Sequence, residues 1–150
     1  MHRYVRPMPT QEQRQRWLRV LACADPDVLA HLMDGDPTDS IDLRTAEVGL
    51  AMVTGRVGAT GDAFGLGEMT LTRCVVQVGS HIGVGYVRGR APQHARRVAL
   101  ADALLQGEAH DRVAAGVIEP LAQLQARREA AHAAEVDTSR VQFLTMVRGN

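Results

Sequence analysis

The chain of 150 residues contains no lysine, and all 17 of its basic residues are arginine. A Schiff-base lysine and the phosphate-binding lysine of a P-loop are therefore both excluded. Codon bias is one explanation of this composition. Selection for the planar, bidentate guanidinium group at interfaces or on phosphates is the other.

Aromatic residues make up only 3% of the chain, and Trp17 is its single tryptophan. A stacking platform for single-stranded nucleic acid needs several aromatic rings beside basic groups. Basic and acidic residues balance at 17 each, so the formal net charge is zero. No overall electrostatic attraction to nucleic acid or to an anionic membrane exists, and we expect neither as a partner.

Cysteine is scarce too: Cys23 and Cys74 share no CxxC spacing, and the six histidines form no HxH or HxxxH pair. Two cysteines cannot hold zinc without histidine, so we expect no metal and no cofactor, and both thiols buried in a reducing compartment. The sequence starts without an apolar targeting segment, and no apolar run approaches the roughly 18 residues of a membrane span. We expect a cytoplasmic protein.

The length and the 45% hydrophobic content fit one globular domain over residues 1–150. Thr10 followed by Gln13 is a capping-box pattern that opens a helix through Trp17. Asp25-Pro26 opens a second helix, with aspartate as N-cap and proline in the first helical position. The sequence therefore predicts an N-terminal pair of helices.

The middle of the chain is rich in β-branched residues. Residues 69–78 and 82–88 read as two strands of a hairpin joined at Gly79-Ser80-His81, and residues 41–57 read as a further strand. Residues 58–67 hold four glycines, which predict an exposed loop of unusual conformation. The hairpin is predicted to be the centre of a sheet.

Helical spacing returns after Pro92, and helical stretches are predicted at about 92–107, 108–118 and 121–134 with a kink or a new start at Glu119-Pro120. Residues 140–148 read as a strand with apolar residues on both faces. The predicted class is α+β: an N-terminal helix pair, a largely antiparallel sheet of about four strands that includes a C-terminal strand, and helices between the hairpin and that last strand.

Two local patterns suggest ligand binding. The glycine-rich segment 58–67 resembles a phosphate cradle, but it lacks G-K-[ST] and precedes a strand, so a structural or interface loop is favoured. Arg90 and His94 lie four residues apart at a strand-to-helix boundary, where they could meet an anion. The simpler interpretation is a charged helix start with a solvent-facing histidine. We predict no catalytic, cofactor-binding or metal-binding residue.

Several blocks of the sequence together resemble one known family. The blocks are RQRWLRVLA (14–22), EVGLAMV (47–53), RVGATGDAFGLGEMTLTRCVV (56–76), GYVRGR (85–90), QHA (93–95) with ALADALLQ (99–106), and EVDTSRVQFLTMVRGN (135–150). In their order and in the length of the chain, they resemble the PhnG family, the small G subunit of the bacterial carbon–phosphorus lyase core complex.

The resemblance implies a role in phosphonate catabolism. The family member is one of four different subunits, each present twice, and its partners are the H, I and J types. The complex removes adenine from ATP and joins ribose 5-triphosphate to an alkylphosphonate such as methylphosphonate. The nucleosidase-like step is attributed to the I subunit, and the later radical cleavage to the J subunit. No catalytic residue is established for the G subunit.

The expected function is therefore a non-catalytic structural subunit, and the alternative is a subunit that binds nucleotide or phosphonate through Arg90 and His94. In one place the chain departs from the family. Ala91-Pro92 stands where an acidic and a basic residue are common, which puts any charged contact made there in doubt. The candidate interface or ligand residues are Glu68, Thr70, Thr72, Arg73, Arg90, His94 and Arg148.

Overall fold

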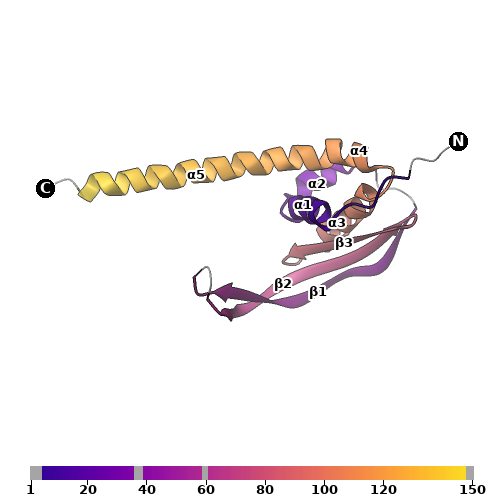
Figure 1. Ribbon diagram of the computed structural model, residues 1–150, viewed down its shortest axis with the longest axis horizontal. Coiled ribbons are helices and arrows are strands. Elements are labelled where there is room, and N and C mark those ends of the chain that lie inside the picture. Colours follow the sequence, from indigo (N-terminus) through magenta and orange to yellow (C-terminus); the bar gives the residue numbers. More distant parts are fainter. Residues whose placement is uncertain (1–4, 36–38, 59–60, 148–150) are drawn as a thin grey trace.

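A three-stranded antiparallel sheet with the order β1-β2-β3 forms one side of the molecule (Figure 1). Its strands are β1 (Ser40–Arg56), β2 (Ala63–Val78) and β3 (His81–Arg88). The computed structural model describes residues 5–35, 39–58 and 61–147, with side chains described as far as Thr138. The predicted α+β class and the antiparallel pairing are confirmed.

The predicted hairpin joins β2 to β3, with paired residues running from Val78 opposite His81 to Leu71 opposite Arg88. Gly79 has a φ of 58° at the turn, a conformation that glycine adopts without steric cost. Alternate β2 residues, Cys74 and Val76 among them, are buried. Strand β2 therefore has one covered face and one more open face.

Helix α3 (Pro92–Leu105) covers that buried face, and its backbone lies directly against β3. A Cβ atom added at Gly83 would overlap the carbonyl oxygen of Ala99, and one added at Gly85 would overlap that of Ala95. Glycine on the strand and alanine on the helix therefore let the two backbones approach closely.

Helices α1 (Gln11–Ala22) and α2 (Pro26–Leu32) form the predicted N-terminal pair. The capping box of Thr10 and Gln13 is present, and the Asp25 side chain caps α2. Trp17, Leu21 and Leu29 belong to the same hydrophobic core as α3. The expectation of two buried thiols is wrong for one of them: Cys74 is buried, but Cys23, the residue that caps the C-terminal end of α1, is exposed.

The last part of the chain is one long helical run. It passes through α4 (His110–Val113) and the π-helical turn η1 (Ala114–Ile118) into α5 (Glu119–Val147). The amide of Glu119 reaches back five residues to Ala114 O. Proline lacks an amide hydrogen and crowds the carbonyl four residues earlier, so we attribute this wider turn to Pro120. None of the helices in the described ranges is long and apolar enough to cross a membrane.

The predicted C-terminal strand is wrong, because residues 140–147 continue α5. Apolar residues at both odd and even positions fit a helix as well as a strand that is covered on both faces. No glycine or proline occurs between Pro120 and Gly149, and extending an existing helix adds one hydrogen bond per residue fixed. The sheet therefore has three strands in the described chain rather than about four.

The glycine-rich loop is shorter than predicted, because β2 already begins at Ala63 and pairs it with Arg56 of β1. The register shifts between Val53 and Thr54, and Gly67 at this irregularity has a φ of 144°. Glycine tolerates both features. Strands β1 and β2 thus continue beyond β3 as a two-stranded arm, defined here as residues 50–56 and 63–70, which projects from the body (Figure 1).

Candidate subunit interface

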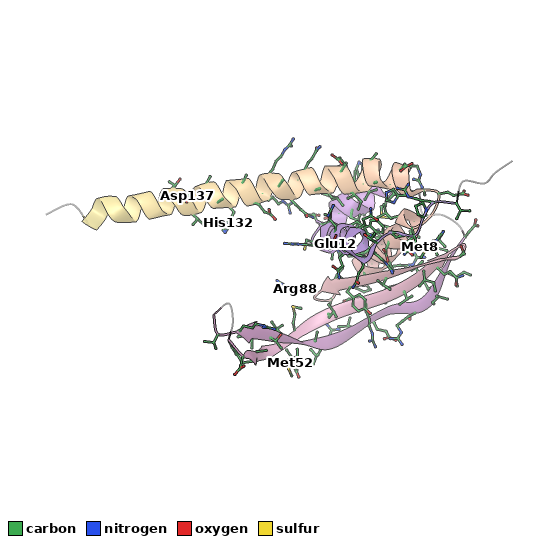
Figure 2. All side chains as sticks on the ribbon, in the orientation of Figure 1. Met8, Glu12, Met52, Arg88, His132 and Asp137 are labelled. Carbon is green, nitrogen blue, oxygen red and sulfur yellow. The ribbon has the colours of Figure 1, made fainter. Side chains whose placement is uncertain are left out.

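The arm exposes apolar side chains that nothing in the described chain covers. Leu50 is 69% exposed and Met52 71%. Figure 2 shows Met52 on the projecting arm. Seven large apolar residues of β1 and β2 are exposed: Ile41, Leu43, Val48, Leu50, Met52, Phe64 and Leu66. An exposed apolar group of this kind is typical of a surface that another protein binds.

Helix α5 is the second element without cover. Its start packs on η1 and α1, where Gln125 donates a hydrogen bond to Val20 O at 2.8 Å. Residues 126–138 are all exposed. His132 and Asp137 lie on the projecting part of the helix (Figure 2), and it extends to the same side of the body as the arm (Figure 1).

Four of the predicted candidates lie on β2. Glu68 is exposed on the arm opposite Met52, and Thr70 is half-buried opposite Leu50. Arg73 is exposed and forms an ion pair of 3.2 Å with Glu47 of the neighbouring strand. Glu68 and Arg73, at an even and an odd position of the same strand, therefore have separate surroundings.

Thr72, the fourth β2 candidate, is buried and joins the end of β3 to the start of α3. Its hydroxyl donates to Gly89 O at 2.5 Å and accepts from the amide of Ala91 at 3.1 Å. These contacts fix the chain as it leaves the sheet and enters the helix. Thr72 thus stabilises the fold internally. It can contribute to an interface only by fixing the position of the connection between β3 and α3.

Arg90 and His94 do not form one surface site. Arg90 is exposed, whereas His94 is only 5% exposed and its Nε2 lies 3.3 Å from Ala22 O at the end of α1. The pKa of His94 is lowered, first by burial and then by the nearby Arg97 cation, against the opposing effects of Ala22 O and Asp25. His94 Nδ1 finds no hydrogen-bond partner among the described residues. Arg148, the remaining candidate, lies outside the described residues.

A buried carboxylate that the sequence did not single out organises the body. Asp102 of α3 is fully buried and accepts hydrogen bonds from Arg14 Nη2 at 2.7 Å, Trp17 Nε1 at 2.8 Å and the amide of Val84 at 2.9 Å. The hydrogen bond to Asp102 raises the pKa of Arg14. Because its oxygens are taken up by these donors, the carboxylate holds α1, α3 and β3 together.

A cavity of about 290 Å³ lies beneath the N-terminal segment, lined by Arg6, Met8, Trp17 and His110 among others. Arg6 is paired with Asp111 at 2.8 Å, and His110 Nδ1 lies 2.6 Å from Leu105 O. Both polar groups therefore have partners within the chain. Among the described residues, no three histidine, cysteine or acidic side chains gather at a point where they could hold a metal ion.

Taken together, these features define an α+β protein with a core fixed by a buried charge network and two projecting elements that expose apolar or alanine-rich surface. Residues 12–149 match the family model of the phosphonate metabolism protein PhnG. The chain is 36% identical over 140 residues to a protein of Rhizobium meliloti (strain 1021) called alpha-D-ribose 1-methylphosphonate 5-triphosphate synthase subunit PhnG, with 91% of this chain and 90% of the relative covered. The chain belongs to the PhnG family.

Proposed function

We propose that this chain is a non-catalytic structural subunit of a carbon–phosphorus lyase core complex. In that complex it assembles with subunits of the H, I and J types, two copies of each. The complex transfers ribose 5-triphosphate from ATP to an alkylphosphonate such as methylphosphonate and releases adenine. The name of the Rhizobium relative, a synthase subunit, supports this assignment.

The observation that carries the structural role is the pair of uncovered elements. An isolated two-stranded ribbon and an unsupported helix are both marginal in water, yet the arm and α5 project from the body with their side chains exposed. A companion subunit that packs against them would supply the missing contacts.

The test is co-expression of the companion subunits from the same source with and without this chain, followed by size-exclusion chromatography and an assay of the transfer of ribose 5-triphosphate from ATP to methylphosphonate. We expect co-elution at a defined stoichiometry and formation of the ribosyl phosphonate product only when the chain is present. Surface variants of the chain should lower activity in proportion to the assembled complex that is lost. A variant that assembles fully but abolishes turnover would contradict the non-catalytic role.

The alternative, a subunit that binds nucleotide or phosphonate through Arg90 and His94, has less support because His94 is buried against α1. Calorimetric titration of the isolated chain with ATP and with methylphosphonate separates the two functions. The structural role predicts no binding, or binding only in the millimolar range.

A further inference from the structure

The sheet has two edge strands, and side chains of the body cover the edge of β3. The amide of Val84 donates to Asp102 Oδ2 at 2.9 Å. The carbonyl oxygen of Ile82 accepts from Gln106 Nε2 at 2.8 Å and from Arg14 Nη2 at 3.2 Å. Backbone groups that would pair with another strand are thus already bonded, which is one way in which proteins prevent pairing at a sheet edge.

The edge of β1 is different, and its outward backbone groups follow from the register. Thr70 O accepts the amide of Gly89, so the backbone of Thr70 points toward β3. Its partner on β1 is Leu50. Leu50 and Thr70 therefore form a non-hydrogen-bonded antiparallel pair, in which the N–H and C=O groups of each residue point away from the other residue. Leu50 therefore directs its N–H and C=O to the free edge, and so do Val48 and Met52, two residues away on either side.

This stretch of β1 lacks the usual protection of an edge strand. Residues 48–55 contain no charged residue and no proline, the devices that commonly keep edges from pairing. The register with β2 is continuous from Glu47 to Val53, whereas irregularities interrupt it between Asp42 and Glu47. The same three residues, Val48, Leu50 and Met52, expose their apolar side chains. A regular, uncharged edge therefore lies beside an apolar strip.

We propose that the free edge of β1 over residues 47–53 pairs with an edge strand of a companion subunit and extends the sheet into it. The partner strand carries apolar residues at every second position, opposite the strip formed by Val48, Leu50 and Met52. A folded subunit is the expected partner because α5 projects to the same side as the arm and also lacks cover. This inference rests on the proposed function and names the mode of assembly.

Hydrogen exchange of the purified complex, compared with the isolated chain, tests the pairing directly. In the complex, amides of peptides covering residues 47–53 should exchange about 100-fold more slowly or more. Peptides covering residues 82–84 of β3 should change little, because the carbonyl oxygen of Ile82 and the amide of Val84 are already bonded. Contact through side chains alone would not protect the outward amides of Val48, Leu50 and Met52 in this way.

Substitution separates the backbone from the side chain. Leu50→Pro removes an amide that the β1–β2 pairing does not use, so we expect the isolated chain to fold and its yield of complex to fall at least tenfold. Leu50→Ala keeps the amide and should lower the yield less. Tyr86→Pro is the matched control: Tyr86 is an exposed residue of β3, 52% accessible, at an outward position two residues beyond Val84.

Each outcome decides one question. Complex formation that survives Leu50→Pro, with no protection over residues 47–53, would overturn strand addition and leave the structural role intact. Absence of any complex with the companion subunits would overturn the proposed function itself. Protection of the same residues in the isolated chain, growing with its concentration, would show that a second copy of this chain occupies the edge, and would also overturn the inference.

Discussion

At the scale of single residues, Asp102 illustrates how a buried charge can be retained. Its carboxylate lies on α3 among apolar neighbours, and the cost of removing it from water is offset only because Arg14, Trp17 and the amide of Val84 all donate to it. The sequence showed the donors, Arg14 and Trp17 one helical turn apart, and the acceptor in an apolar run. It could not show that these distant segments meet.

Asp102→Asn should therefore destabilise the isolated chain by about 3 kcal/mol. This is near the lower end of the cost of breaking a buried pair, because the side chain of Arg14 is still 34% exposed. Urea unfolding measures the change. The control is Asp111→Asn, which breaks the exposed ion pair with Arg6 and should leave the midpoint unchanged. Equal midpoints for both variants would contradict the role given to Asp102.

His94 gives a prediction about pH. Burial lowers its pKa below the ordinary value of 6.5, so the unfolded chain binds this proton before the folded chain does as the pH falls. The stability that neutral His94 contributes is complete above pH 6.5 and is lost as the pH falls through the folded-state pKa.

Between about pH 7.5 and about pH 5.5, the urea midpoint of the natural chain should consequently fall further than that of His94→Gln. His132→Gln changes an exposed histidine of α5 and should follow the natural chain. A parallel pH dependence in His94→Gln would show that His94 does not titrate differently on folding.

At the scale of elements, the contact between β3 and α3 depends on glycine. Gly85→Ala places a methyl group where Ala95 O lies, so α3 must move away from the sheet. We expect a loss of about 1–3 kcal/mol or more in urea unfolding. Gly49→Ala is the matched control on β1, since nothing lies within 4 Å of the added Cβ. It should be neutral or slightly stabilising, and a similar loss in both would contradict the close packing.

The elements also show what the sequence could and could not predict. Local chemistry was sufficient for the capping box of Thr10, the Asp25 cap and the β2–β3 hairpin, because neighbours in the sequence determine each of them. It failed at residues 140–147, where the pattern of apolar residues fits a strand or a helix equally well, and the continuation of α5 decides for the helix. It also failed at residues 63–67, where pairing with β1 across the chain makes a strand of a glycine-rich segment. The roles of the candidate residues at an interface remain predictions, and two of them, Thr72 and His94, lie inside the body.

At the scale of the whole molecule, folding and assembly are assigned to different parts of the chain. The core is formed by α1, α2, α3, the buried face of the sheet, and the helical run only as far as Leu121. The arm and the remainder of α5 add little that is buried within this chain. A single subunit would therefore fold around the core, and its projecting elements would gain their stability from a partner.

Removal of residues 129–150 tests this division of roles. The truncated chain keeps Leu121 and the hydrogen bond from Gln125 to Val20 O, and the deleted residues whose side chains are described are exposed. Its thermal midpoint should therefore match that of the full chain, while its co-elution with the companion subunits should be lost or greatly reduced. Leu121→Ala provides the opposite case, because truncating this buried side chain should cost about 2–5 kcal/mol of stability and leave the projecting surfaces unchanged. Full assembly by the truncated chain would mean that the outer part of α5 is not a contact surface, and would leave the arm as the principal candidate.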